Sequence, residues 1–538
     1  MVSAPQSEAA YEGARILADG GNAADALVTA ALIQGVTDPH RSGLGGFGCA
    51  TVWWNEANAP QALSVGFHGR CGAHARADQW ADLFEYPAPD GFGYIVKGKS
   101  NDVGYQAVTT PGMLAGVAAI HRRFGRKSWR EVVERAALYA EEGFLVTPGL
   151  AEFWIRPGLY GRVSTRDRIG HTDAGRAICI KADGSTYKAG DVFVQKDLAR
   201  TYRRIAAEGP ESFYRGAIAR EIAADWKRGG ALVTEEDLRD YSVDEEAPLE
   251  GTYRGLRILT SPLPGGGAAL LQALKLVEEL PPEELHPRGK LSHNSPEFID
   301  RIARILKVVW ADRLENHGDP RFGSKSAQSL LSADWLATLR DRAQAPFAPP
   351  PRAAETGGTT QLTILDAAGN AISFSHSLGY GSGVFTAGLG FMFNNCMSGF
   401  DPVPGRTNSI EAGKARSTAV AETIILRDGQ PWLIMGSPGG ARITAALVQT
   451  IVAMVDFGMT AAEAVLQPRF DGYGERNLFL ESRFPLPIAR ALRARGWEVA
   501  QSPKPFGMVG RVYAIEVLSD GRLVGGMDPG EPGAIARG

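Results

Sequence analysis

The sequence predicts an α+β protein in which layers of helices cover a largely antiparallel β-sheet. Two observations carry this prediction. Apolar residues recur at helical spacing through most of the first two thirds of the chain, and from Thr359 onward short alternating segments are joined by tight turns. Long helical runs followed by hairpins favour separate helical and sheet layers. Because 538 residues exceed the usual size of one hydrophobic core, we expect several domains or one large layered unit.

The first part of the chain is expected to be rich in helix. Residues 4–36 show a helical period that Asp-Gly-Gly-Asn at 19–22 interrupts, which predicts two packed helices. A Gly-rich loop at 38–48 then leads into a β-rich segment, and helical patterns dominate residues 115–304. Residues 343–358 are rich in Pro, Ala and Gly and have no period, so we expect a flexible, exposed linker there.

The composition changes sharply after this linker. Alternating residues around short turns predict hairpins, and a continuous apolar run predicts a buried helix. The expected elements are a hairpin of 359–366 with 371–377, a hairpin of 423–426 with 431–435, a helix at 441–457, and strands near 478–481 and 512–524.

The charge and hydropathy of the sequence indicate which kinds of partner the protein binds. Lys and Arg number 57 against 60 Asp and Glu, a net charge of -3 without a basic block, so we expect neither a nucleic acid nor a membrane partner. The most apolar window, 441–457, is interrupted by Arg442 and Asp456. Residues 1–8 lack the basic segment and apolar core of a secretory signal, so we expect a cytoplasmic protein that binds a small molecule.

The four cysteines are too few and too scattered for a disulfide framework, and no spacing typical of a metal site is present. We therefore expect buried free thiols, no metal and no organic cofactor. Any catalysis then depends on side chains and backbone donors.

The junction between Gly358 and Thr359 is the strongest chemical feature of the sequence. A flexible Gly-Gly segment that ends at a Thr opening a strand suits a precursor that cuts itself. The Thr359 hydroxyl would attack the Gly358 carbonyl, and hydrolysis would leave Thr359 with a free α-amino group that can act as base for its own hydroxyl. From strand composition alone, Thr359 would be interpreted as an ordinary β-branched strand residue.

Several ordered motifs decide between these two interpretations. In order along nearly the whole chain, the sequence resembles the γ-glutamyltransferase family of the N-terminal nucleophile hydrolase superfamily. The segments that carry the resemblance are Thr359-Thr360-Gln361, residues 366–370, 388–395, 436–443 and 467–470, and, nearer the N-terminus, 20–26, 39–47, 111–112, 213–216, 230–241, 311–313 and 318–320.

The resemblance implies a four-layer αββα sandwich built from one precursor. Residues 1–358 would form the large subunit and 359–538 the small subunit, together one structural unit. Thr359 would be the nucleophile, and the backbone amides of Gly439 and Gly440 would form the oxyanion hole. Ser377, 18 residues after Thr359, takes the place of a hydroxyl residue that hydrogen-bonds the nucleophile. Whether the enzyme is a homodimer stays open.

Departures from the family pattern fall on the residues that hold a γ-glutamyl donor. His68 stands where the family has the Arg that binds the donor carboxylate, and Arg70 lies two residues on. The amide and acidic residues that would hold the donor amino group align with Gly379, Cys396 and Gly399, and a Ser-Ser pair aligns with Thr418-Ala419. The substrate-binding candidates are His68, Arg70, Thr360, Gly379, Cys396, Thr418 and Arg416, and Arg442 is a further cation near the site.

Burying an ammonium group without acceptors is costly, so this pocket should discriminate against a glutamyl head group. The remaining arginines favour an anionic acyl group. The segment 400–415 is shorter than the lid-bearing loop of typical transferases, which favours hydrolysis over transfer. We therefore expect an amidohydrolase for a small carboxylate-bearing, oxamate-like or other non-glutamyl amide. The alternatives are a γ-glutamyl hydrolase or transferase with a relocated carboxylate clamp, and a catalytically silent binding protein.

Overall fold

The computed structural model describes residues 1–55, 59–89, 91, 93–285, 291–345, 347, 358–503, 505–506, 509–531 and 533–538. Most of the expected linker at 343–358 lies outside the described residues, so its flexibility stays a prediction. Within the described ranges, no helix is both long and apolar enough to cross a membrane.

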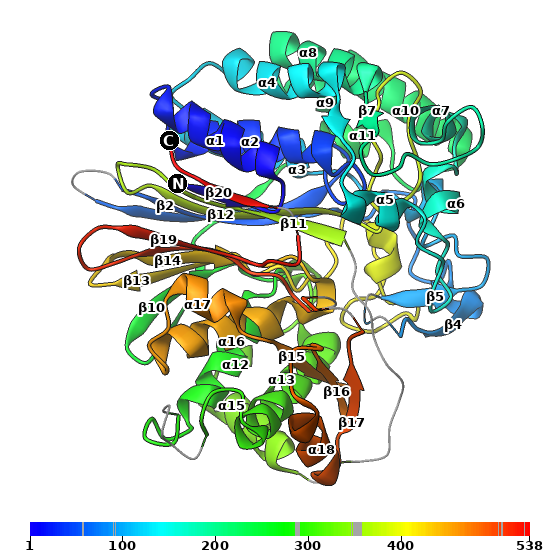
Figure 1. The fold of residues 1–538 in the computed structure, drawn as a ribbon. Helices are drawn as coiled ribbons and strands as arrows, with labels where there is room; N and C mark the ends of the chain where they lie inside the picture. Colours follow the sequence, from blue (N-terminus) through cyan, green and yellow to red (C-terminus); the bar gives the residue numbers. More distant parts are fainter. Residues whose placement is uncertain are drawn as a thin grey trace.

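Two antiparallel sheets stacked face to face form the centre of the molecule (Figure 1). In pairing order, the first consists of β20 (Ala534–Ala536), β1 (Val2–Ala4), β11 (Gly358–Leu365), β12 (Ala371–Gly379), β2 (Phe47–Trp54), β3 (Gln61–Phe67) and β8 (Asp244–Glu246). The second consists of β19 (Leu523–Met527), β18 (Tyr513–Val517), β14 (Gln430–Gly436), β13 (Thr423–Arg427), β10 (Leu256–Thr260) and β9 (Leu249–Tyr253).

Hydroxyl side chains join the two sheets across their shared interface. Thr363 Oγ1 donates to the Tyr513 carbonyl at 3.1 Å, and Ser373 Oγ donates to the Met435 carbonyl at 2.8 Å. These small side chains allow the sheets to approach closely while both hydroxyls keep a hydrogen-bond partner, as buried polar groups require. The interface therefore holds β11 and β12 in a fixed position.

Helices cover the outer faces of both sheets (Figure 1). On the seven-stranded sheet lie α1 (Ser7–Ala18), α2 (Ala23–Thr37) and α3 (Met113–Phe124), with α4 (Trp129–Glu142) and α8 (Lys196–Glu208) packed outside α2. On the six-stranded sheet lie α12 (Gly267–Glu278), α16 (Ile443–Val455) and α17 (Ala461–Leu466), with α13 (Pro296–Asn316) and α15 (Ala333–Gln344) outside them. The expected αββα architecture is confirmed.

Smaller elements complete the described chain. They are η1 (Ala81–Leu83), β4 (Phe84–Pro87), β5 (Tyr94–Val96), η2 (Tyr105–Ala107), β6 (Phe144–Leu145), α5 (Pro148–Trp154), α6 (Thr165–Ile169), α7 (Asp173–Cys179), β7 (Val192–Phe193), α9 (Glu211–Tyr214), α10 (Ala217–Gly229), α11 (Glu235–Arg239), η3 (Pro320–Phe322), α14 (Ala327–Leu330), η4 (Cys396–Gly399), η5 (Gly440–Arg442), β15 (Phe470–Tyr473), β16 (Asn477–Leu480), α18 (Leu486–Ala494) and β17 (Glu498–Gln501).

The sequence explains where the first helices begin and end. The Asn22 side chain accepts from the backbone amides of Ala24 and Asp25, and the Asp25 carboxylate accepts from the Asn22 amide, so a capping box starts α2. All of α2 is buried, as its nearly uninterrupted apolar composition demands. The predicted start of the first helix was wrong. We expected the helical pattern to begin at Ala4, but residues 2–4 form β1 because they pair with β11 and β20.

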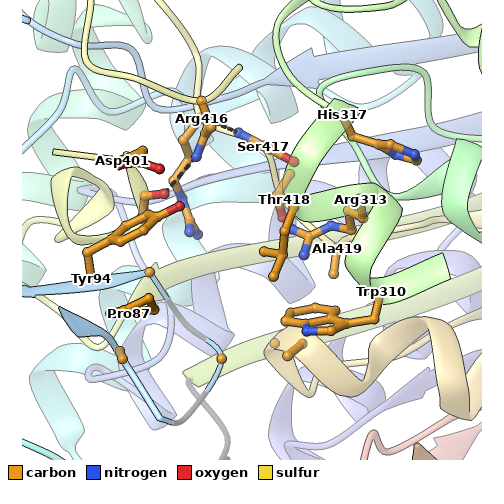
Figure 2. A pocket seen from close by; sticks show the side chains of 18 of the residues that line it. Pro87, Tyr94, Trp310, Arg313, His317, Asp401, Arg416, Ser417, Thr418 and Ala419 are labelled. Atoms are coloured by element: carbon orange, nitrogen blue, oxygen red, sulfur yellow. Dashed lines mark hydrogen bonds between the residues drawn. The ribbon is translucent and has the colours of Figure 1, made fainter. Parts of the chain in front are cut away.

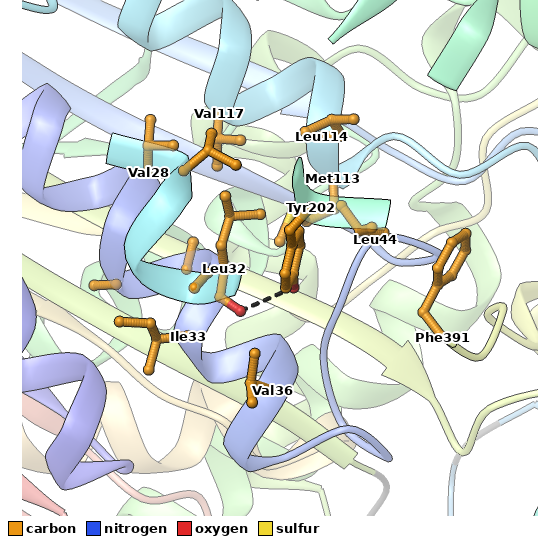
Figure 3. Close-up of a cluster of buried hydrophobic side chains, with 14 of the residues drawn as sticks. Val28, Leu32, Ile33, Val36, Leu44, Met113, Leu114, Val117, Tyr202 and Phe391 are labelled. Atoms are coloured by element: carbon orange, nitrogen blue, oxygen red, sulfur yellow. Dashed lines mark hydrogen bonds between the residues drawn. The ribbon is translucent and has the colours of Figure 1, made fainter. Parts of the chain in front are cut away.

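A dense core packs between α2, α3 and α8 (Figure 3). Leu32 and Val36 of α2 contact this core, and Tyr202 of α8 inserts its ring with the hydroxyl donating to the Leu32 carbonyl at 3.0 Å. The expected burial of the four free cysteines is also confirmed.

Buried histidines make the fold sensitive to acid. His376 on β12 is fully buried, with Nε2 2.9 Å from Gln34 Oε1, and burial lowers its pKa to about 3. The unfolded chain takes up a proton at this residue near pH 6.5 and the folded chain does not, so stability is lost as the pH falls from 6.5 toward 3.

We predict that His376→Asn reduces this loss. Between pH 7 and pH 5 the free energy of unfolding of the variant should fall by about 2 kcal/mol less than that of the parent protein, measured by urea denaturation. Equal losses in both proteins would contradict the assignment.

Candidate active site

The junction between Gly358 and Thr359 lies at an irregularity in the central sheet. Gly358 pairs with Gly379, but Thr360 pairs with His376, so Thr359 alone lies opposite both Ser377 and Leu378 of β12. Such bulges redirect side chains and are common beside active sites. Here the bulge brings the Ser377 hydroxyl to the backbone at the expected cut.

Ser377 joins the two residues of the junction. Its hydroxyl donates to the Gly358 carbonyl at 2.5 Å and accepts from Thr359 Oγ1 at 3.3 Å and from the Gly379 amide at 2.8 Å. The Gly358 carbonyl is thereby polarised beside the Thr359 hydroxyl. Both side chains are buried, with Thr359 only 7% exposed. The arrangement favours attack of Oγ1 on that carbonyl.

We predict that Ser377→Ala slows maturation. Removing a donor aimed at a developing oxyanion typically costs about 3 kcal/mol of barrier, so cutting should slow by roughly 100-fold. The measurement is the time course of two chains appearing by intact mass. Ser373→Ala is the matched control, since Ser373 lies on the same strand but bonds the Met435 carbonyl. Equal rates in the two variants would exclude this role of Ser377.

A glycine turn precedes α16 and faces the same region. Gly439 has φ 151° and Gly440 has φ 56°, values that side chains rarely allow. A Cβ on Gly439 would approach the Gly510 Cα to 2.6 Å, so this position also needs the close backbone contact. Because η5 and α16 continue from this turn, its amides lie at the positive end of a helix, where a developing oxyanion is favoured.

One large cavity of about 1640 Å³ connects these groups (Figure 2). Both parts of the chain line it. Among its lining residues are Phe47, Tyr86, Tyr94, Trp310 and Arg313 from the first part, and Thr359, Asp401, Arg416, Thr418, Gly440, Arg442 and Asp471 from the second. A cavity that contains a hydroxyl nucleophile candidate, a glycine turn and several cations can bind an anionic molecule next to Thr359.

Arg416 occupies the space that a side chain at Gly399 would need. A Cβ on Gly399 would lie 2.4 Å from Arg416 Nη1, and the guanidinium stacks over Phe47 at 4.9 Å from the ring centroid. A cation therefore stands at the point where the family resemblance leads one to expect an acid. Thr418, two residues on, also lines the cavity, and its hydroxyl accepts from the Val420 amide.

Arg442 lines the cavity as well, but it is engaged. Its guanidinium lies 3.6 Å from the Asp471 carboxylate and stacks over Phe479. Burial raises the pKa of Asp471 to about 7, and the Arg442 charge offsets that shift only in part. This pair forms the wall of the cavity beneath the glycine turn.

Five of the seven substrate-binding candidates do not line the cavity. Thr360 points to the opposite side of β11, where its hydroxyl bonds Gln6 and Gln34. Gly379 pairs with Gly358, and Cys396 is fully buried with its pKa raised by burial. Gly439 also lies behind the lining, which Gly440 reaches. The substrate-binding candidates absent from the described lining are His68, Arg70, Thr360, Gly379 and Cys396, and the catalytic candidates Ser377 and Gly439 are absent from it as well.

Two of the substrate-binding candidates, His68 and Arg70, lie away from the cavity lining. Burial lowers the pKa of His68 to about 4, so it is uncharged at neutral pH. Arg70 forms an ion pair with Asp244 at 2.7 Å and stacks over Tyr241. Their positions do not support a role in gripping the donor carboxylate.

Comparison with known proteins shows which family the chain belongs to. A model described as gamma-glutamyltranspeptidase matches residues 9–538. The chain belongs to the γ-glutamyltranspeptidase family. It is accordingly an enzyme of the N-terminal nucleophile hydrolase superfamily, as the motifs around Thr359 implied.

Individual relatives cover nearly the whole chain. A glutathione hydrolase proenzyme of Escherichia coli (strain K12) is 30% identical over 98% of this chain and 90% of its own length. Acylase ACY 1 proenzyme of Pseudomonas sp. (strain V22) is 31% identical over 98% of this chain and 91% of its own. Among solved structures, the cephalosporin acylase from Bacillus halodurans superposes with a TM-score of 0.86 at 27% identity, covering 100% of this chain and 95% of that one.

The γ-glutamyltranspeptidase fold thus supplies two features that the sequence did not reveal. The aromatic residues of the cavity wall include Tyr86 and Tyr94 of the β4–β5 hairpin and Trp310 of α13, whereas none of the lining residues from the short segment 400–415 is aromatic. Arg313, one turn after Trp310, is the second feature. Arg313 belongs to the segment 311–313 that carried the family resemblance, but nothing in the local pattern places Arg313 or Trp310 in the wall of a cavity. Among the described residues, no cluster of three or more His, Cys, Asp or Glu side chains could hold a metal ion.

Proposed function

We propose that this protein is an autoprocessing amidohydrolase whose nucleophile is Thr359 and whose acyl donor carries a carboxylate. The single observation that carries the proposal is the contact of Ser377 with both Thr359 Oγ1 and the Gly358 carbonyl at the edge of the cavity. The same hydroxyl network can serve the precursor and the mature enzyme.

In the precursor, Thr359 Oγ1 attacks the Gly358 carbonyl carbon while Ser377 stabilises the oxygen. The C–N bond breaks, an ester joins Gly358 to Thr359 Oγ1, and the freed nitrogen becomes the α-amine of Thr359. Water then hydrolyses the ester. The products are pieces of 358 and 180 residues.

In the mature enzyme, the Thr359 amine takes the hydroxyl proton and Oγ1 attacks the substrate amide carbon. The oxyanion forms at the glycine turn that Gly440 brings to the cavity. The proton passes to the leaving amine as the C–N bond breaks, and an ester joins the acyl group to Thr359. Water attacks this ester, releases the acid and restores the hydroxyl. The large cavity, about 1640 Å³, leaves room for water at the ester, which favours hydrolysis over transfer.

The acyl donor follows from the charges in the cavity. Arg416 fills the space beside Gly399, so a donor ammonium group would meet a cation instead of an acid. A carboxylate at that end of the acyl group is favoured instead. Relatives named as acylases support a non-glutamyl donor, and relatives named as glutathione hydrolases support the γ-glutamyl alternative.

The decisive experiment uses two anilides that differ by one amino group. Glutaryl p-nitroanilide and γ-glutamyl p-nitroanilide share the chain and the carboxylate. We expect the matured protein to prefer the glutaryl compound by at least about 10-fold in kcat/KM. A preference for the γ-glutamyl compound would establish the relocated clamp instead. Purified protein that stays uncut and hydrolyses neither compound would support the catalytically silent alternative.

A further inference from the structure

Arg41 lies directly against the junction at which the chain is expected to be cut. It belongs to the Gly-rich loop between α2 and β2. Its backbone carbonyl accepts from the Leu378 amide at 2.9 Å, and Leu378 is one of the two residues opposite Thr359 at the bulge. A Cβ on Gly358 would lie only 3.1 Å from Arg41 Cγ, so the aliphatic part of the Arg41 side chain packs against the junction itself. Arg41 therefore contacts both strands at the expected cut.

Two carboxylates hold the Arg41 guanidinium in place. Its Nη1 lies 2.6 Å from Glu531 Oε1 and 3.4 Å from Asp38 Oδ2. The guanidinium also stacks over Phe153, 5.3 Å from the ring centroid. The side chains of Arg41 and Glu531 are only 16% and 10% exposed, so water screens this pair much less than an ion pair on the surface. The long Arg41 side chain is thus fixed at its far end as well as along its stem.

Glu531 also binds a second cation, Arg511, in an ion pair. The Arg511 amide donates to the Pro438 carbonyl at 2.9 Å, directly before the glycine turn. Burial and the Arg41 charge lower the pKa of Arg511 to about 10, so the two guanidinium groups repel each other and the Glu531 carboxylate holds them together. The two arginines are matched by two carboxylates, which favours a positioning role for this cluster over the binding of an anion.

We propose that Arg41 and Glu531 form a positioning pair for maturation: Glu531 fixes the Arg41 side chain, and Arg41 holds the Gly358–Thr359 peptide against the Ser377 hydroxyl. This inference rests on the proposed self-cleavage at Thr359. Gly358 has no side chain of its own to fix its backbone, so a neighbouring side chain must restrict it. The attack requires Thr359 Oγ1 and the Gly358 carbonyl carbon to stay aligned, and a misplacement of about 1 Å can cost about 100-fold in rate.

The test measures how fast two chains appear after cell-free synthesis, by intact mass. Arg41→Met keeps the aliphatic stem and removes the guanidinium, and Glu531→Gln keeps the shape of the side chain and removes its charge. We expect each substitution to slow the cut by roughly 10- to 100-fold. Since the two residues act as one pair, the double variant should be no slower than the slower single variant. Arg41→Lys, which keeps stem and charge, should recover part of the rate.

Arg135→Met is the control for the loss of a partly buried ion pair. Arg135 of α4 pairs with Glu12 of α1 at 2.8 Å, away from the junction, so this variant should cut at the parent rate. Thermal unfolding checks that each variant folds. If Arg41→Met does not fold, Glu531→Gln and Arg41→Lys decide instead.

Cutting at the parent rate in Arg41→Met and Glu531→Gln, or equal slowing in Arg135→Met, would overturn the inference. The outcome for the parent protein separates this inference from the proposed function. A parent chain that stays uncut would refute both. A parent chain that cuts itself, with variants that keep pace, would refute only the positioning pair.

Discussion

Thr359→Ala is expected to yield a single 538-residue chain that hydrolyses no amide. The substitution removes the only hydroxyl that can attack the Gly358 carbonyl from the next residue, and without the cut the α-amine of residue 359 never forms. The loss of turnover should be complete within the detection limit, at least about 10⁴-fold. Intact mass under denaturing conditions and an anilide assay report the two losses separately.

Two variants serve as controls for this result. Thr359→Ser keeps the hydroxyl and should still mature. Thr360→Ala removes a hydroxyl from the adjacent residue, where it bonds Gln6 and Gln34 in the core, so it should lower stability but leave the cut intact. Two chains of 358 and 180 residues in Thr359→Ala would refute the mechanism.

The second large effect is expected at the glycine turn. Gly439→Ala places a Cβ 2.6 Å from the Gly510 Cα at φ 151°, so the turn must shift and carry the Gly440 amide with it. An oxyanion donor that moves out of line typically costs 10²- to 10³-fold in kcat, so we expect a loss on the order of 10²- to 10³-fold, with KM changing less.

Gly429→Ala is the matched control for backbone strain. Gly429 has φ 76° on the β13–β14 turn, and nothing lies within 4 Å of its Cβ position. This variant should lose a little stability, about 1 kcal/mol, and no activity. The measurement is kcat and KM of the matured Gly439→Ala and Gly429→Ala variants by steady-state kinetics. Equal activities would show that the turn does not hold the oxyanion.

Features encoded by nearby residues could be predicted from the sequence, and features encoded by distant contacts could not. The hairpin that begins at Thr359 follows from alternation and from the turn at 367–370, whereas Ser377 was singled out by the family resemblance. Strands β1 and β20 are three residues each and form only because their partners come from the far end of the chain.

In the candidate site, too, some residues could be predicted from the sequence and others could not. Gly440 and Thr418 reach the cavity as their motifs implied, whereas Arg70 is drawn away by Asp244, 174 residues later in the chain. Arg313 belongs to the segment 311–313 that carried the family resemblance, but its place in the cavity wall follows only from how α13 packs in three dimensions.

The order of strands in the seven-stranded sheet has a consequence for the life of the enzyme after cutting. Strand β1, from the N-terminal piece, lies between β11 and β20, both from the C-terminal piece (Figure 1). Strand β2 of the N-terminal piece also pairs with β12, and in the second sheet β10 pairs with β13. Separating the pieces would therefore break three ladders in the first sheet and one in the second, so the cut enzyme should hold together without a covalent link. The kinetics of renaturation should differ between the two forms. The uncut chain refolds as one molecule, at a rate that does not depend on protein concentration. The two cut chains must first associate, so their rate of renaturation depends on concentration.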